Sequence, residues 1–122
     1  MEKIKEDKER EERLYNDIIV DAYDDEERLM GWEAYLDDAL HFPFEAKCIK
    51  EIITSPLLKN EKVRVLERVD TEISGHTMSV MIEWQNRVLG VPLEQLLPIH
   101  SDEETLEAVK DWHYWIGRGY QL

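Results

Sequence analysis

The spacing of apolar residues changes twice along this chain, and these changes constrain the fold more than any other feature. Over residues 14–40 apolar side chains recur every three or four residues, which is typical of amphipathic helices. Over residues 45–91 short runs alternate apolar and polar residues, which is typical of half-buried strands. Helical spacing returns over residues 101–117. Since 122 residues is the length of one domain, the pattern predicts a single α+β domain over residues 1–122.

Local signals predict where the helices begin and end. We expect a first helix from Leu14 to about Tyr23, and a second that begins after Asp24, an N-cap with Glu27 closing a capping box. The sequence Phe42-Pro43-Phe44 stops the second helix, because proline disfavours helical geometry in the residue before it.

The middle of the chain predicts short antiparallel strands separated by turns. The expected strands share alternating or β-branched residues and turn signals at their ends; they cover residues 45–49, 62–69, 77–84 and 87–91. Gln85-Asn86 predicts a tight hairpin between the last two. Such a set of short strands favours a small SH3-like barrel.

The end of the chain predicts two more helical segments. Leu93 to Leu97 is expected to form a short helical turn. Ser101 is expected to cap a final helix, with Glu104 completing its capping box and Gly117 or Gly119 ending it. The predicted architecture is therefore two N-terminal helices packed beside a small antiparallel SH3-like β-barrel, with a C-terminal helix.

The net charge of −13 is concentrated in one segment. Residues 14–38 contain nine acidic residues and one basic residue, whereas residues 1–13 are nearly balanced and suggest a charged, flexible or frayed arm. This balance argues against nucleic acid and anionic membranes as partners, since both are bound by clustered Lys and Arg. It permits binding of cations or of a basic protein partner.

Cysteine content and hydropathy indicate the compartment. The single cysteine, Cys48, allows no intrachain disulfide, which favours a reducing environment. The N-terminus shows no signal-peptide pattern, and no apolar run reaches the ~20 residues of a membrane span. We therefore expect a cytoplasmic protein.

The placement of the acids on the second helix favours a metal site. Glu26, Glu33 and Asp37 share one stripe of this helix. Asp37 and Asp38 lie near its C-terminus, where the helix dipole disfavours anions, so capping does not explain them. Ca²⁺ prefers six to eight oxygen ligands, which carboxylates supply.

Other familiar motifs are missing from the sequence. An EF-hand alignment starting at Asp21 places Glu26 where the loop needs glycine and Trp32 where it needs the bidentate glutamate. The sequence contains no HExxH, CxxC, P-loop or nucleophile elbow. We therefore expect no enzyme and no transition-metal site, and we expect His113 and Cys48 to be core residues.

Several runs together resemble one family. They include IIVDAYDDEERLMGW from Ile18, YLDDALHFPFEAKCI from Tyr35, VMIEWQNRVLGVPLEQL from Val80 and DWHYWIGRGY from Asp111. These resemble the bacterial calcium-binding proteins of the CcbP type, best known from cyanobacteria, over residues 14–122. The resemblance implies a small acidic cytosolic protein that binds Ca²⁺ without an EF-hand, with helices beside a small β-barrel. The matching runs include Asp21, Glu26 and Asp111.

The residue pattern and the resemblance together give one set of predicted calcium ligands. The set combines acids that capping leaves unexplained with acids inside the matching runs: Asp21, Asp24, Glu26, Asp37 and Asp38, with Glu33 and Asp111 added. The predicted function is reversible calcium binding as a cytosolic buffer or sensor. The alternative is an interaction module that uses the SH3-like sheet or the acidic face to bind a basic protein.

Overall fold

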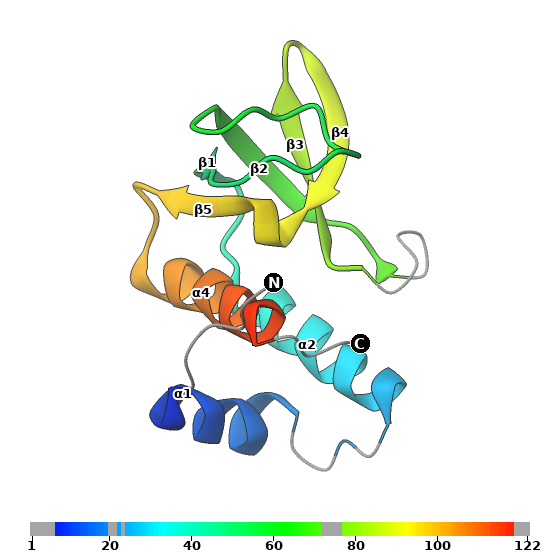
Figure 1. Cartoon of the computed structure of the whole chain (residues 1–122), viewed down its shortest axis with the longest axis vertical. Coiled ribbons are helices and arrows are strands. Elements are labelled where there is room, and N and C mark those ends of the chain that lie inside the picture. The colour runs from blue at the N-terminus through cyan, green and yellow to red at the C-terminus, as the bar shows by residue number, and fades with distance from the viewer. Residues whose placement is uncertain (1–6, 20–21, 23, 72–76, 119–122) are drawn as a thin grey trace.

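The computed structural model describes residues 7–19, 22, 24–71 and 77–118. The elements follow the chain in the order α1 (Lys8–Arg13), η1 (Leu14–Ile18), α2 (Asp25–Ala39), β1 (Phe44–Cys48), β2 (Lys62–Arg68), β3 (Ser79–Trp84), β4 (Arg87–Pro92), η2 (Leu93–Gln95), β5 (Leu96–Ile99) and α4 (Glu103–Gly117). The sheet forms one layer, α2 and α4 form the next, and α1 lies beyond them, away from the sheet (Figure 1). The predicted α+β class is confirmed.

The sheet is antiparallel and open. Its strand order is β4-β3-β2-β1-β5, so β4 and β5 are the two edges. The short 3₁₀ turn η2 carries the chain from one edge strand to the other, and the two edges do not pair with each other among the described strands. The prediction of a closed SH3-like barrel is therefore not confirmed.

The predicted hairpin between β3 and β4 is confirmed. Trp84 pairs with Arg87, which leaves Gln85 and Asn86 as a two-residue turn. Both turn residues have positive φ, 49° and 64°. Primed turns of this kind match the twist of the strands that they join.

Helix α2 begins as the sequence predicts. Asp24 is its N-cap, and the Asp24 carboxylate accepts a hydrogen bond from the Glu27 backbone N–H at 2.8 Å. The helix ends at Ala39, and Leu40 is already extended. The chain then turns into β1 through Phe42-Pro43, whose peptide bond is cis.

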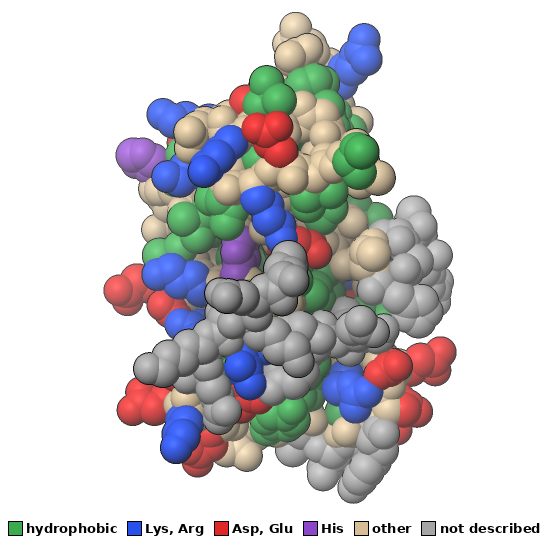
Figure 2. All heavy atoms as spheres, viewed as in Figure 1, with side chains coloured by type: hydrophobic (Ala, Val, Ile, Leu, Met, Phe, Trp, Pro, Cys, Tyr) green, Lys and Arg blue, Asp and Glu red, His purple; other side chains and the backbone are tan. Residues whose placement is uncertain are grey.

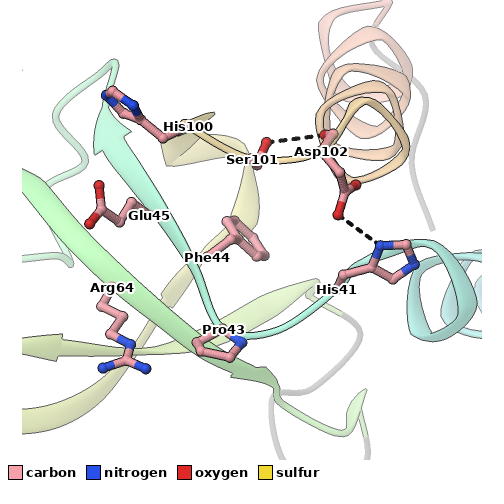
Figure 3. A pocket seen from close by; sticks show the side chains of 8 residues that line it. All are labelled: His41, Pro43, Phe44, Glu45, Arg64, His100, Ser101 and Asp102. Carbon is pink, nitrogen blue, oxygen red and sulfur yellow. Dashed lines mark hydrogen bonds and ion pairs between the residues drawn. The ribbon is translucent and has the colours of Figure 1, made fainter.

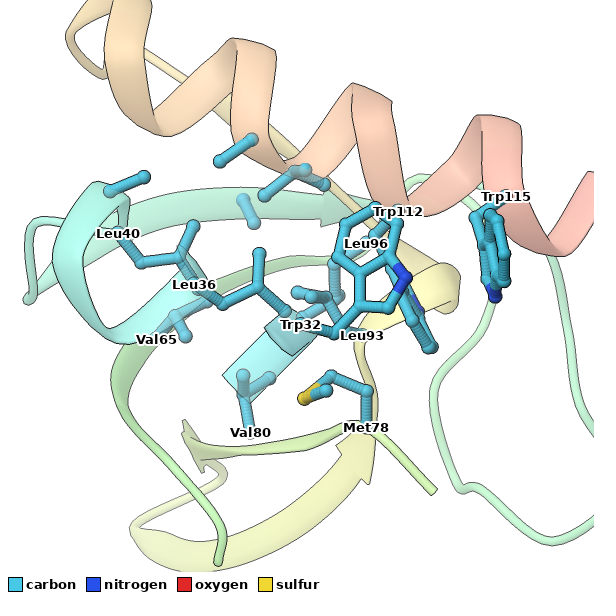
Figure 4. Close-up of a cluster of buried hydrophobic side chains, with 14 of the residues drawn as sticks. Trp32, Leu36, Leu40, Val65, Met78, Val80, Leu93, Leu96, Trp112 and Trp115 are labelled. Atoms are coloured by element: carbon cyan, nitrogen blue, oxygen red, sulfur yellow. The ribbon is translucent and has the colours of Figure 1, made fainter. Parts of the chain in front are cut away.

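The core lies between the sheet and the two long helices (Figure 4). Trp32 and Leu36 of α2 face Trp112 and Trp115 of α4, and all four are almost completely buried. The Trp32 and Trp112 rings meet edge to face, with 5.1 Å between centroids and 78° between planes. Aromatic side chains of this size contribute a large share of the buried apolar area.

Three predicted segments differ from the structure. The first helix is not a single element over residues 14–23, because α1 starts at Lys8 and residues 14–18 form a π-helical turn. Helical geometry after β4 ends at Gln95, and the following residues form β5, which pairs with β1. The N-cap of α4 is Asp102, not Ser101, because the Asp102 side chain accepts from the Thr105 N–H at 2.7 Å.

None of the helices in the described parts of the chain is both long enough and apolar enough to cross a membrane. Acidic side chains in the view of Figure 2 gather mainly over the helical part of the molecule.

Candidate metal site

The start of α2 carries a group of exposed carboxylates. Asp24, Asp25 and Glu26 are all exposed, and Asp25 pairs with Arg28 one turn further along. One oxygen of Asp24 caps the helix. Of the predicted ligands near this point, Asp21 lies outside the described residues. Asp24 and Glu26 therefore form the exposed acidic part of the predicted set at this end of the helix.

The end of α2 is different because a cation already lies there. The Asp37 carboxylate accepts two hydrogen bonds from the Arg68 guanidinium, at 2.6 Å and 2.9 Å. Arg68 also contacts Glu33 at 3.0 Å, and Thr71 donates to the other Glu33 oxygen at 2.8 Å. Hydrogen bonding to Asp37 and the nearby negative charges raise the pKa of Arg68. The guanidinium is 10% exposed and neutralises part of this acidic end.

Asp38 is exposed beside this ion cluster. Its neighbour Asp37 uses both carboxylate oxygens to bind Arg68. The unfavourable position of Asp37 at the helix C-terminus therefore has a compensating cation within the protein. At this end of α2, Asp38 is therefore a stronger candidate for a metal ligand than Asp37.

Asp111 lies at the centre of a third cluster. The side chain of Asp111 is completely buried. Its carboxylate accepts from Arg10 and from both terminal nitrogens of Arg13, and the Tyr35 hydroxyl donates to it at 2.6 Å. The hydrogen bond to Asp111 raises the pKa of Arg13. Burial, followed by the bond to Asp111, raises the pKa of Tyr35.

The predicted ligands within the described residues therefore separate into three places in the fold. A helix rises about 1.5 Å per residue, so about 20 Å separates Asp24 from Asp38. Ca²⁺ binds oxygens at about 2.3–2.6 Å, so one ion cannot use both ends of α2. Within the part of the chain that the structure describes, no three His, Cys, Asp or Glu side chains are grouped closely enough to hold a metal.

An ion cluster that the sequence did not predict lies at the N-terminal end of α4. His41 bridges two carboxylates of that helix's first turn, with Nδ1 2.8 Å from Asp102 and Nε2 2.7 Å from Glu104. The hydrogen bond to Asp102 is the main cause of the raised pKa of His41. The pKa of Asp102 falls to about 2, mainly through its bond from the Thr105 N–H. Sequence spacing gave no signal for this contact, because it joins segments that are far apart in the chain.

A cavity of about 600 Å³ lies beside this cluster (Figure 3). His41, Arg64 and His100 contribute basic groups to its lining, and Glu45 and Asp102 contribute acids. The mixed lining gives the cavity no excess of carboxylates comparable to the start of α2.

Two further predictions concern side chains that could bind transition metals. Cys48 is buried as predicted. His113 is largely buried between α4 and β5, with Nε2 2.6 Å from the Leu96 carbonyl oxygen, and burial lowers its pKa. Cys48 belongs to the packed interior, and His113 lies at its edge and is partly exposed.

The fold and the charge distribution define an acidic α+β protein that carries exposed carboxylates at both ends of α2. The sequence matches the family Calci_bind_CcbP, described as calcium binding, over residues 12–116. No curated protein sequence matches the chain.

Two solved structures share the fold. "The crystal structure of Anabaena CcbP" is 37% identical, with a TM-score of 0.85 and 100% of both chains covered. "Calcium binding protein in the calcium-binding form" is 38% identical, with a TM-score of 0.82 and 95% of both chains covered. The chain therefore belongs to the CcbP-type calcium-binding family. Ca²⁺ is the ion of this family, which is not an enzyme family.

Proposed function

We propose that this protein binds Ca²⁺ reversibly and acts as a calcium buffer or sensor through acidic sites other than an EF-hand. The observation that carries the proposal is the similarity to the solved structure of a calcium-binding protein in its calcium-binding form, at 38% identity over 95% of both chains. The family match over residues 12–116 supports it independently. The whole chain, residues 1–122, acts as one calcium-binding domain, and no catalysis is expected.

The first candidate position for the ion is the start of α2. Asp24 and Glu26 are exposed there, and no guanidinium contacts either of them among the described residues. Asp21 is retained as a predicted ligand at this position from the sequence alone. Hard oxygen ligands of this kind suit Ca²⁺.

The second candidate position is Asp38, at the other end of α2. It is exposed, whereas Glu33 and Asp37 beside it already bind Arg68. Asp111 is also fully engaged, by two arginines and a tyrosine. A metal would have to displace these groups before Glu33, Asp37 or Asp111 could bind it.

Calcium titration of matched variants tests this assignment. Asp24→Asn with Glu26→Gln removes two charges, and Asn caps a helix about as well as Asp, so α2 keeps its N-cap. We expect calorimetry to show Ca²⁺ affinity falling about tenfold or more, since affinity depends on ligand charge. Asp37→Asn with Asp38→Asn is the matched control for charge, and its effect should be smaller.

The absence of any response of the unaltered protein to Ca²⁺ would contradict the proposal. A ligand that binds the native state must stabilise it. If millimolar Ca²⁺ gives the unaltered protein neither heat nor a rise in Tm, with Mg²⁺ as the comparison ion, the protein does not bind calcium. If only the Asp37/Asp38 pair matters, the site lies at the end of α2.

The cysteine content bears on the compartment in which the protein works. A buried free thiol, Cys48, is consistent with a reducing compartment such as the cytoplasm.

The alternative function is binding of a basic protein by the acidic helical face, which the net charge of −13 favours. Co-purification that survives removal of calcium would support the alternative.

A further inference from the structure

Asp111 joins three elements that are distant in the sequence. It lies on α4, and its carboxylate binds Arg10 and Arg13 of α1 and the Tyr35 hydroxyl of α2. The side chain is completely buried, whereas Arg10 and Arg13 are 20% and 38% exposed. A buried carboxylate is stable only when it is paired and hydrogen-bonded, so this arrangement fixes all three elements to one point. We call these four side chains the α1 latch.

Polar contacts hold α1 in place. None of its residues, 8–13, is buried. Besides the latch, Arg10 contacts Glu107 at 3.2 Å, and the Asp7 N–H donates to the Tyr114 hydroxyl at 3.0 Å. Because α1 buries no apolar side chain of its own, its position depends on these contacts and on its buried C-cap residue, Leu14.

The residues that directly follow α1, 14–19, are packed against α2. Leu14, Ile18 and Ile19 are buried. The Ile18 carbonyl oxygen lies so close to α2 that a Cβ on Gly31 would be 2.3 Å from it. One turn beyond Gly31, Tyr35 contacts Asp111. Residues 14–19 are therefore held between the latch at one end and the close contact of Ile18 with α2 at the other.

We propose that the α1 latch positions the start of α2 for calcium binding, with Asp111 as a positioning residue rather than a ligand. The inference rests on the proposed calcium site at Asp24 and Glu26. A binding site that is already ordered loses less entropy when it takes up its ligand, so the latch should raise the affinity. By reciprocity, Ca²⁺ should stabilise the docking of α1 by the same factor.

The test compares two single substitutions on α1 in the full chain. Arg13→Gln removes one charge and the Arg13 contacts with Asp111, whereas Lys8→Gln removes one charge from an exposed position on the same helix. Loss of a positive charge favours Ca²⁺ similarly in both variants, so their difference reports the latch. We expect calorimetry to show about three- to tenfold weaker binding in Arg13→Gln than in Lys8→Gln, the scale of ordering one or two side chains.

Each outcome has a distinct meaning. If Arg13→Gln binds Ca²⁺ more tightly than Lys8→Gln, the arginine competes with the metal and Asp111 is a ligand, which overturns the inference. Equal affinities also overturn it while leaving calcium binding in place. If the unaltered protein does not bind Ca²⁺, both proposals fail.

A second variant and a second measurement distinguish loss of the α1 latch from misfolding of the protein. Tyr35→Phe removes only the hydroxyl that donates to Asp111 and keeps the ring packed against Trp32. It should weaken Ca²⁺ binding in the same direction. Amide hydrogen exchange at Glu11 and Leu14, which bond to carbonyls of residues 7 and 10, should slow on adding Ca²⁺. Unchanged exchange in a protein that binds Ca²⁺ would contradict the coupling.

Discussion

The two ends of helix α2 have similar sequences but different electrostatic environments. Asp24 to Glu27 at the start and Asp37-Asp38 at the end are both acidic. At the start, the Glu27 backbone N–H donates to the Asp24 carboxylate, and the Arg28 side chain pairs with Asp25. Both carboxylates stay exposed. At the end, Arg68 from β2 binds both Asp37 and Glu33 and is itself nearly buried.

The comparison shows that acidic residues alone do not define a cation site. A guanidinium held in place by the fold competes with any metal for the same oxygens, and its bidentate geometry makes that competition strong. A cap uses one carboxylate oxygen and leaves the other available. On this basis calcium should favour the start of α2, and the following predictions test the difference between the two ends.

The largest expected effect is a loss of stability when the support for the start of α2 is disturbed. Gly31→Ala places a Cβ 2.3 Å from the Ile18 backbone oxygen, so the chain before α2 must move. Overpacking against backbone costs about 3 kcal/mol, and thermal unfolding should show a Tm lower by about 10 °C. Gly90→Ala is the control, because its Cβ would make only ordinary contacts, 3.7 Å from Met81. Equal Tm values for the two variants would contradict the close approach.

A smaller effect on stability is expected when the end of α2 loses its cation. Arg68→Gln removes the guanidinium that binds Glu33 and Asp37, and should lower the free energy of unfolding by about 1–2 kcal/mol, since both carboxylates remain partly solvated. Without Arg68 the end of α2 should resemble the start and bind Ca²⁺ more tightly.

Calorimetric titration and chemical denaturation would measure both effects. Arg64→Gln, an exposed arginine on the same strand, is the matched control. If Arg68→Gln binds Ca²⁺ no better than Arg64→Gln, then Arg68 does not limit metal access there.

The smallest effect is expected from His41, which follows the end of α2. Its pKa is raised in the folded state by Asp102, so the stabilisation is complete below the unfolded pKa of about 6.5 and is lost as pH rises through the folded pKa. His41→Gln should therefore lower Tm at pH 6 and leave it unchanged at pH 9. His100→Asn, which removes a second histidine from the lining of the same cavity, is the matched control. A Tm difference that grows with pH would contradict the assignment.

Much of the fold could be predicted from local sequence. Asp24 begins α2 because a carboxylate there satisfies a backbone N–H wherever the helix packs. Gln85-Asn86 gives the hairpin because the alternating residues around it pair in register. The short helical turn predicted over Leu93 to Leu97 is wrong at Leu96 and Leu97, since a short apolar run has no distinctive period and the strand character of β5 comes from pairing with β1.

The ion partners of the acids could not be predicted from the sequence. Arg68 is about thirty residues from Asp37, and Arg13 is about a hundred from Asp111. The sequence predicted a cation near Asp37, but not that an arginine from another element supplies it. The same limitation applies to His41 and Asp102.

The sequence by itself determined the two long helices, α2 and α4, and most strands. It also determined the concentration of negative charge and the resemblance to a calcium-binding family, because these depend on neighbouring residues and their order. Only the tertiary structure decided which carboxylates are already neutralised and which stay exposed. Charges interact through space, and a guanidinium from another element satisfies a carboxylate only when the fold brings the two together.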